Sequence, residues 1–265
     1  MAREFETLAS GYRLVEAPRP DGSGGVLFSD VSAGGVYKWT PDGVSTVLPR
    51  RRGVGGLVPH AGGGVLITGR DLALDGRTLV KPPAGVTGFN DLVTMDDGSV
   101  LVGALRFRPM DGEPPAAGSV WCVGHSGGLS LFAPDVLWPN GIGVSPAGDV
   151  VYVSNYTQGE VLAFDADGNN RRVFVRPGLG QPDGLAVDAE GCVWVALGEG
   201  CAFCRYTPEG EVDELVELPG VFVASVAFDG KTLLVATNGS LLRTDVGVAG
   251  RRVPAATVAA WAISI

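Results

Sequence analysis

The stretch WPNGIGVSPAGDVVYVSNY, residues 138–156, is followed by a near-copy of itself, QPDGLAVDAEGCVWVAL, residues 181–197. In both, Pro precedes one short polar residue and Gly, and then come an apolar run, a Gly-bearing turn and a second apolar run. Short apolar runs separated by Gly turns indicate antiparallel strands. The polar residue is Asn140 in the first copy and Asp183 in the second. The pair therefore predicts a repeated structural unit whose variable residue faces a common site.

A Gly turn followed by a short β-rich run occurs six times along the chain, at residues 22–31, 62–70, 96–105, 147–155, 190–197 and 229–238. The runs are about 35 to 50 residues apart, which suits one four-stranded sheet per repeat. An up-and-down barrel would also use short strands, but it would not require this long period. The sequence therefore predicts an all-β chain that forms a six-bladed β-propeller of four-stranded antiparallel blades around a central channel.

We expect residues 1–265 to form this propeller as a single domain, with the ring closed by strands from both chain ends. The last blade still needs an outer strand, and two segments are candidates: residues 4–10 (EFETLAS) and residues 257–265 (TVAAWAISI). The sequence leaves the choice between them open. A closed ring needs no partner to fold, so we expect a monomer or a weak homo-oligomer.

The charge of the chain excludes some classes of partner. Its net charge is −9 and its pI about 4.7, with no basic stripe, which argues against nucleic acid and against an anionic membrane. The first ten residues contain no apolar run typical of a signal peptide, and the apolar end of the chain is shorter than the roughly 20 residues that span a bilayer. We therefore expect a cytoplasmic protein that acts on a small molecule.

Four cysteines include one C-x-x-C, formed by Cys201 and Cys204. This pair would suit a redox motif or half of a zinc site, but no second C-x-x-C completes a four-sulfur zinc site. Ordinary reduced cysteines are the simpler interpretation, in keeping with a cytoplasmic chain.

The inner strands of a propeller line its channel, so polar residues at their beginnings are candidates for chemistry. Four of them offer oxygen ligands: Glu16, Asn90, Asn140 and Asp183. Singly, an Asn-Gly or Asp-Gly pair such as those at Asn140 and Asp183 is a turn former, but four polar residues at equivalent blade positions favour a site. Two carboxylates and two amide carbonyls suit one hard divalent cation in the channel. Ca²⁺ is the first choice because it tolerates irregular geometry; Mg²⁺, Mn²⁺ and Zn²⁺ are the alternatives, and zinc is less favoured without His or Cys ligands.

The chain resembles the senescence marker protein/gluconolactonase/luciferin-regenerating enzyme family over essentially its whole length. The most specific passages are FNDLVTMDDGSVLVGAL (89–105), PNGIGVSPAGDVVYVSNY (139–156) and PDGLAVDAEGCVWVA (182–196). The resemblance implies a lactonase-like propeller with one divalent metal. It implies that Glu16 matches the glutamate of the family's E-G-P motif, Asn140 its P-N-G ligand and Asp183 its P-D-G aspartate. Asn90 matches a channel asparagine that in some relatives touches the metal, and in others meets it through water or contacts substrate.

The chain departs from the family pattern at two places, one beside Glu16 and one that bears on the substrate. The glycine after the first glutamate is Ala17, and no Trp follows. Sugar-lactonase members carry an Arg two positions before the channel asparagine, where this chain has Gly88. Without that guanidinium the site lacks a bidentate donor for a polyhydroxylated or anionic substrate, so we expect a less polar one.

The candidate substrate-binding residues are Asn90, His60, Trp138, Phe222 and Gly88. Trp138 and Phe222 lie in segments that face the channel, and they predict an apolar wall. His60 precedes the second repeat and is a candidate for substrate contact or proton transfer, although an ordinary loop histidine would look the same. Neither histidine accompanies a G-x-S-x-G elbow, so a Ser-His-Asp site is not expected.

The sequence thus predicts a divalent-metal-dependent hydrolase of a lactone or related ester. Asp183 is the candidate catalytic residue, either as general base on water or as nucleophile, and the sequence does not separate these roles. Two alternatives stay open. One is a different metal-dependent reaction on the same scaffold, by a cyclase, dehydratase or organophosphate hydrolase. The other is a non-catalytic propeller that serves as a binding module.

Overall fold

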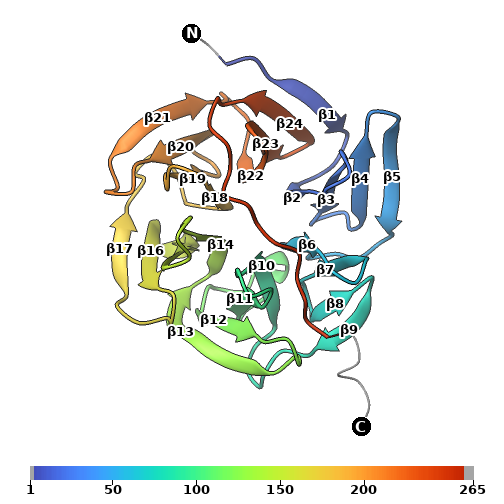
Figure 1. Ribbon diagram of the computed structural model, residues 1–265, viewed down its shortest axis with the longest axis vertical. Helices are drawn as coiled ribbons and strands as arrows, with labels where there is room; N and C mark the ends of the chain where they lie inside the picture. The colour runs from blue at the N-terminus through green and yellow to red at the C-terminus, as the bar shows by residue number, and fades with distance from the viewer. Residues whose placement is uncertain (1–2, 260–265) are drawn as a thin grey trace.

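The computed structural model describes residues 3–259, and within them it contains six four-stranded sheets arranged in a ring (Figure 1). The innermost strands of all six sheets line one central cavity, which we call the channel. The predicted all-β, six-bladed propeller with antiparallel four-stranded blades is confirmed. The helices in this part of the chain are two short 3-10 turns, η1 (Pro109–Asp111) and η2 (Tyr156–Gln158). Neither of them has the length or the apolar character needed to cross a bilayer.

The first three blades follow one another along the chain. Blade 1 consists of β2 (Val15–Pro20), β3 (Val26–Asp30), β4 (Val36–Thr40) and β5 (Gly43–Leu48). Blade 2 consists of β6 (Leu57–Pro59), β7 (Val65–Ile67), β8 (Leu72–Leu74) and β9 (Arg77–Val80). Blade 3 consists of β10 (Gly88–Thr94), β11 (Val100–Leu105), β12 (Ala117–Val123) and β13 (Leu129–Leu137).

The remaining blades complete the ring. Blade 4 consists of β14 (Pro139–Val144), β15 (Val150–Asn155), β16 (Glu160–Asp165) and β17 (Arg172–Val175). Blade 5 consists of β18 (Leu185–Val187), β19 (Val193–Ala196), β20 (Ala202–Tyr206) and β21 (Val212–Glu217). Blade 6 consists of β22 (Val223–Asp229), β23 (Thr232–Thr237), β24 (Ser240–Asp245) and β1 (Glu6–Ser10).

The outer strand of blade 6 comes from the beginning of the chain. Strand β1 pairs antiparallel with β24, from Glu6 opposite Arg243 to Ser10 opposite Ser240. Of the two candidate segments, residues 4–10 therefore take this place. Residues 257–259 of the other segment lie elsewhere, and residues 260–265 are outside the described part of the chain.

Residues 250–259, which we call the C-terminal strap, cross one end of the channel (Figure 1). The N–H of Arg251 donates to the carbonyl of Val187 in blade 5, at 2.9 Å. Further along, the N–H of Ala256 donates to Pro59 in blade 2, also at 2.9 Å, and that of Thr257 donates to Gly98. The strap thus spans the ring and distinguishes its two faces.

The hydrophobic core lies between neighbouring blades. Trp194 in blade 5 is 1% exposed, and its ring packs edge-on against Phe228 of blade 6 at 5.8 Å between centroids. Blades 6 and 1 meet in the same way, because Leu8 of β1 packs in one cluster with Phe28. Each blade therefore buries its apolar faces against two neighbours. The contact between blades 6 and 1 stabilises the ring in the same way as the contacts between the other blades.

Truncating Leu8 tests the closure of the ring by β1. The change Leu8→Ala removes buried apolar surface between blades 6 and 1, so we expect it to lower the free energy of unfolding by about 2 kcal/mol or more. Urea denaturation measures the loss. Val44→Ala, on an exposed face of blade 1, is the control and is expected to change stability by less than about 0.5 kcal/mol. Equal effects of the two substitutions would show that β1 does not contribute to closure.

Candidate functional site

Three inner strands carry a bulge at the predicted ligand position. In β10, Asn90 and Asp91 together lie opposite one residue of β11. In β14, Asn140 and Gly141 together lie opposite one residue of β15. Strand β2 has a similar register shift just after Glu16. A bulge redirects side chains out of the regular alternation and is common beside active sites.

Asp183 lies just before β18 and is 4% exposed. Its carboxylate accepts a hydrogen bond from the side-chain amide of Asn140, which opposes the effect of burial on its pKa. Among the described residues, its Oδ1 atom has no hydrogen-bond partner. Its own carbonyl accepts from the N–H of Gly141 at 3.2 Å, which ties the start of β18 to β14. A buried carboxylate oxygen without a donor is costly unless a cation or a proton satisfies it.

Three carboxyl groups crowd this part of the channel. Burial raises the pKa of Glu16 well above its ordinary value, and the nearby charges of Asp183 and Asp91 raise it further. Burial and the charge of Asp91 likewise raise the pKa of Asp183. Burial raises the pKa of Asp91 to about 6, although the Arg19 guanidinium opposes the shift. Mutual repulsion of desolvated carboxylates is what a bound cation would relieve.

Asn90 of blade 3 lies next to the first residues of blade 4. Its Nδ2 donates to the carbonyl of Pro139 at 3.1 Å, which orients the side chain and leaves the Oδ1 atom available as a ligand. Gly55 of blade 2 lies against this oxygen, since a Cβ atom at that position would come within 2.4 Å of it. The absence of a side chain at residue 55 therefore lets Asn90 occupy its position.

These residues fit the divalent cation that the sequence predicts. The set contains buried carboxylates, amide oxygens, and an Asp183 oxygen without a partner among the described residues. The guanidinium of Arg19 lies 4.0 Å from Asp91, one carboxyl of the three. Charge balance and donor type thus both favour a hard cation such as Ca²⁺.

An aromatic group adjoins the carboxylates. The ring of Trp138 lies 4.7 Å from that of Tyr156 and 5.1 Å from that of Phe107, between centroids. Burial raises the pKa of Tyr156 to about 12, and the charges of Asp183 and Glu16 contribute to the shift. Because these charges act on its hydroxyl, Tyr156 links the aromatic group to the candidate metal ligands.

Phe222 and Gly88 border other parts of the ring. Phe222 is half-buried just before β22, and its ring lies against Gly198 of blade 5, where an added Cβ would be 3.3 Å away. Gly88 is buried at the start of β10, where an added Cβ would come within 2.8 Å of the carbonyl oxygen of Gly69. The backbone of blade 2 therefore occupies the space that a side chain at residue 88 would need.

His60 does not join the other predicted residues. It follows β6, whereas Glu16, Asn90 and Asn140 lie near the starts of their strands. Its Nε2–H donates to the carbonyl of Val258 in the C-terminal strap at 3.0 Å, and its Nδ1 accepts from the N–H of Gly62. The structure thus places His60 at the strap end of the channel, where both ring nitrogens are engaged.

Sequence reasoning missed Asp91 and Phe107 as parts of the site. Asp91 directly follows Asn90, and in a regular strand two successive side chains point to opposite faces. The bulge in β10 removes that alternation. The FND motif was the sequence signal that could have identified Asp91, because it brings a carboxylate next to the candidate ligand Asn90.

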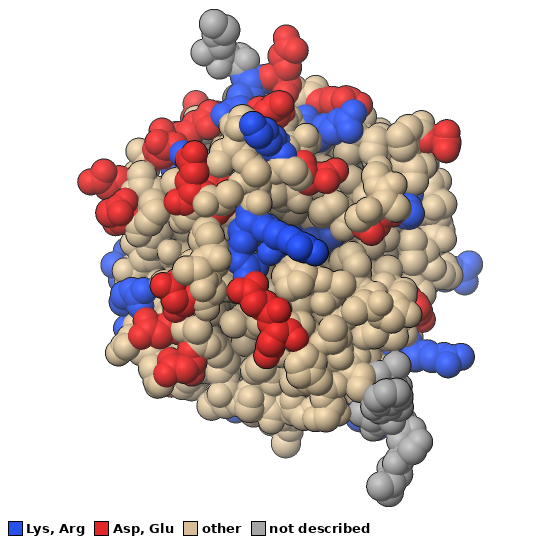
Figure 2. All heavy atoms as spheres, viewed as in Figure 1, with Lys and Arg blue, Asp and Glu red and all other residues tan. Residues whose placement is uncertain are grey.

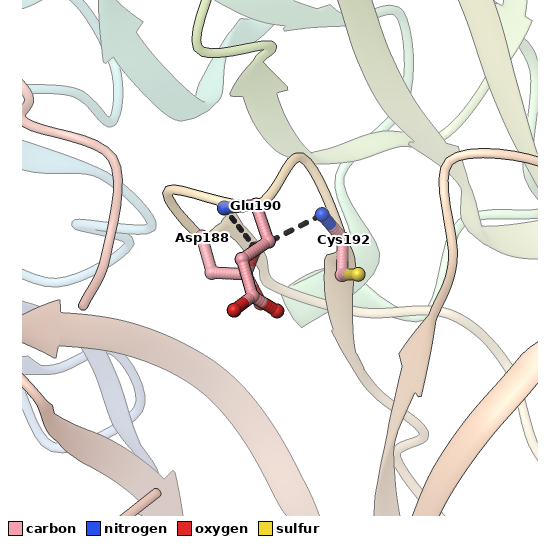
Figure 3. A group of neighbouring side chains, drawn as sticks. All are labelled: Asp188, Glu190 and Cys192. Carbon is pink, nitrogen blue, oxygen red and sulfur yellow. Dashed lines mark hydrogen bonds between the residues drawn. The ribbon is translucent and has the colours of Figure 1, made fainter. Parts of the chain in front are cut away.

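A second acidic cluster lies at the turn between β18 and β19, at the other end of β18 from Asp183. It consists of Asp188, Glu190 and Cys192 (Figure 3). The guanidinium of Arg205 lies 2.8 Å from the Asp188 carboxylate and 2.6 Å from that of Glu190. Burial and the charge of Asp188 raise the pKa of the Cys192 thiol, which keeps it protonated. Arg205 therefore already supplies the positive charge here, and we interpret the cluster as an ion-pair network.

Comparisons with known proteins agree with this geometry. Residues 14–239 match the family described as the SMP-30/Gluconolactonase/LRE-like region. The chain belongs to this family. It is 32% identical over 226 residues to a 6-deoxy-6-sulfogluconolactonase from Pseudomonas putida, covering 78% of this chain and 76% of that protein.

Solved structures extend the comparison. A gluconolactonase from Xanthomonas campestris is 26% identical, with a TM-score of 0.81 over 91% of this chain and 89% of the other. A calcium-binding regucalcin from Agrobacterium tumefaciens has a TM-score of 0.79 at 20% identity, over 97% of this chain and 98% of the other, which shows a shared fold. Family members of this kind therefore share both the propeller and its overall dimensions.

The raised pKa of Asp183 predicts how the metal-free protein responds to pH. A carboxyl whose pKa is higher in the folded than in the unfolded chain stabilises the fold while protonated, and this stability is lost as the pH rises above the ordinary value of 3.8. Asn imitates the protonated form. In a chelator, Asp183→Asn should therefore become increasingly more stable than the unmodified protein between pH 4 and pH 7, as measured by urea denaturation.

The control for this experiment is Asp167→Asn. Hydrogen bonds from Asn169 lower the pKa of the exposed Asp167 carboxyl, so its substitution should show no gain over the same pH range. Saturating Ca²⁺ should stabilise the unmodified protein more than Asp183→Asn. A stability difference between Asp183→Asn and the unmodified protein that does not vary with pH would contradict the electrostatic description of the site.

Proposed function

We propose that this protein is a lactonase that depends on one divalent cation held by Glu16, Asn90, Asn140 and Asp183. The observation that carries the proposal is the buried Asp183 carboxylate, whose Oδ1 atom has no partner among the described residues and which lies beside other carboxyl groups. The names of its relatives, a 6-deoxy-6-sulfogluconolactonase and a gluconolactonase, support lactone hydrolysis. Ca²⁺ is the proposed ion, supported by the all-oxygen ligand set and by the shared fold of a calcium-binding protein.

The proposed reaction opens the ester bond of a lactone and yields a hydroxy acid. A bound cation would polarise the lactone carbonyl and stabilise the negative charge that develops on its oxygen. Asp183 either takes a proton from the attacking water or attacks the carbonyl carbon itself. The hydrogen bond from Asn140 would orient its carboxylate for either role. Asn90, fixed by its bond to Pro139, would offer its Oδ1 atom as a further ligand.

Removing the metal or the carboxylate tests this proposal. Chelation should abolish lactone turnover, and Ca²⁺ should restore it; parallel additions of Mg²⁺, Mn²⁺ and Zn²⁺ would identify the preferred ion. Asp183→Asn should lower kcat by about 10²- to 10⁴-fold, the usual contribution of a general acid or base. Calorimetry should still detect Ca²⁺ binding to this variant, because an amide oxygen remains. Asp167→Asn, on an exposed turn, is the control.

Full turnover by Asp183→Ala on every accepted lactone would refute a catalytic role for Asp183. A single turnover in ¹⁸O-labelled water tests the nucleophile role. Attack by Asp183 on the lactone carbonyl would form a mixed anhydride, and label in the Asp183 carboxylate would show that water opened this anhydride at the Asp183 carbon. Label in the hydroxy acid alone is expected for a general base and for an anhydride opened at the acyl carbon, and mass spectrometry of rapidly quenched protein, which detects the acyl-enzyme, separates these two cases.

We further propose that the substrate is less polar than a sugar lactone. The aromatic group of Phe107, Trp138 and Tyr156 adjoins the carboxylates, and Phe222 borders the ring at blade 6. Gly88 brings no guanidinium to the position where sugar-lactonase members carry one, and the blade 2 backbone leaves no room for it. The residues that would meet substrate therefore lack the bidentate donor that a polyhydroxylated ligand requires.

A substrate panel tests the proposed polarity. We expect a higher kcat/KM for γ-nonalactone or dihydrocoumarin than for glucono-1,5-lactone, with a phosphotriester included to test the organophosphate hydrolase alternative. Trp138→Ala should reduce kcat/KM for the apolar lactones by about tenfold, which corresponds to an aromatic contact of about 1.4 kcal/mol. The same variant should change turnover of gluconolactone much less. Preference for gluconolactone over every apolar lactone would refute the inference from Gly88.

The cytoplasmic location stays a prediction. The four cysteines are free in the structure, with Cys204 buried and Cys201 partly exposed, in keeping with a reducing compartment.

A further inference from the structure

Arg19 and Asp91 form a buried ion pair between two strands that carry candidate ligands. Strand β2 bears Arg19 as well as Glu16. Strand β10 bears Asp91 as well as Asn90. The Nη2 atom of Arg19 lies 4.0 Å from the Asp91 carboxylate, and the two side chains are 10% and 5% exposed. The pair reaches from blade 1 to blade 3, past blade 2, which lies between them in the ring (Figure 1). It therefore connects the strand of one candidate ligand to the strand of another.

The backbone around the pair fixes both charged groups. A Cβ atom at Gly56, just before β6, would lie 2.7 Å from the backbone nitrogen of Leu92 and 3.0 Å from the Cα of Asp91. Blade 2 therefore packs directly against β10 at this point. The N–H of Leu92 donates to Oδ1 of Asp91 at 2.7 Å. On the other side of the pair, Nη1 of Arg19 donates to the carbonyl of Pro18 at 2.9 Å. Neither charge is thus free to leave the pair without a change in the backbone.

The charge of Asp91 acts on both candidate carboxylate ligands. It raises the pKa of Asp183 and that of Glu16. The positive charge of Arg19 lowers the pKa of Glu16. Glu16 and Asp183 together carry two negative charges, which match one divalent cation. The Asp91 carboxylate would add a third charge in excess of this match, and the guanidinium beside it cancels that excess.

We propose that Arg19 is a positioning residue of the candidate metal site, which holds the Asp91 carboxylate in place and cancels its charge, so that the site matches a divalent ion. The inference rests on the cation site proposed above, and it concerns the affinity of that site and its selectivity for ion charge. Without Arg19, three carboxylates would face the cation. The site would then bind cations more tightly, and trivalent ions would gain the most.

Calorimetry on the full chain, in a buffer of pH 8, tests the sign of this effect. Arg19→Met removes the positive charge, so we expect Ca²⁺ to bind at least about tenfold tighter than to the unmodified protein. Asp91→Asn removes the negative charge and should weaken Ca²⁺ binding by at least about tenfold. The double variant restores the charge balance, and its affinity should lie within about threefold of the unmodified one. Loss of a purely structural contact would weaken binding in both single variants.

The charge of the ion provides a second readout. Coulomb energy is proportional to ion charge, so the logarithm of the gain in affinity caused by Arg19→Met should be about 1.5 times as large for Tb³⁺ as for Ca²⁺. Luminescence of Tb³⁺ and its displacement by Ca²⁺ measure the two affinities. Arg19→Lys keeps the charge and should leave both affinities within about threefold of the unmodified values.

Arg251→Met is the matched control. Arg251 is also a buried arginine, with its side chain 6% exposed, and it pairs with the carboxylate of Asp96. It belongs to the C-terminal strap, at the other end of the channel, where basic side chains lie over the middle of the strap face (Figure 2). Its substitution should change Ca²⁺ affinity by less than about threefold, because solvent and salt screen a distant charge.

The outcomes separate this inference from the proposed function. If the unmodified protein does not bind Ca²⁺, the cation site is refuted and the inference with it. If it binds Ca²⁺ but Arg19→Met binds it equally or more weakly, the inference alone is refuted; an equal gain in Arg251→Met has the same meaning. Thermal melting checks that each variant is folded. If Arg19→Met does not fold, the comparison of Asp91→Asn with the double variant decides, because the added substitution should then tighten Ca²⁺ binding by at least about tenfold.

Discussion

The repulsion among Glu16, Asp91 and Asp183 is the constraint on which much of this structure depends. Each carboxyl is removed from water; Asp183 and Asp91 raise the pKa of Glu16, and Asp91 raises that of Asp183. Such a group is held together only if the surrounding fold fixes it in place and if a positive charge is available. The hydrogen bond from Asn140 to Asp183 and the guanidinium of Arg19 beside Asp91 meet part of this requirement. A divalent cation would meet the rest, which explains why these ligand types occur together.

The fold fixes the carboxyls by closing a ring. Backbone bonds pass directly between inner strands, from Gly141 to Asp183 and from Gly184 to Ala224 at 2.8 Å. Glycine at residue 141 is required for this approach, because an added Cβ would lie 2.4 Å from the backbone nitrogen of Leu185. The site is therefore built on the rigid inner strands, where small displacements are resisted by every neighbouring blade.

The two ends of the channel have different chemistry. At the end where the inner strands begin, carboxylates and amides gather beside aromatic rings, an arrangement suited to a cation and a substrate. At the other end the C-terminal strap closes over apolar walls and adds Arg251. His60 belongs to this second end, because its imidazole bonds to Val258 of the strap. The C-terminal strap, a short segment without regular secondary structure, thus makes the chemistry of the two channel ends different.

Periodicity in the sequence determined the blades, because alternating apolar residues and Gly turns are local signals that repeat with the structural unit. It also determined the four candidate ligands, since Glu16, Asn90, Asn140 and Asp183 occupy equivalent places in the repeat. The tertiary structure alone decided which chain end completes blade 6, because two segments had β character and only one lies beside β24. It alone brought Asp91 to the site, through a bulge that local alternation does not predict. Arg19 lies beside Asp91 for the same reason: contacts between residues far apart in the chain depend on how the ring closes, and no local pattern records them.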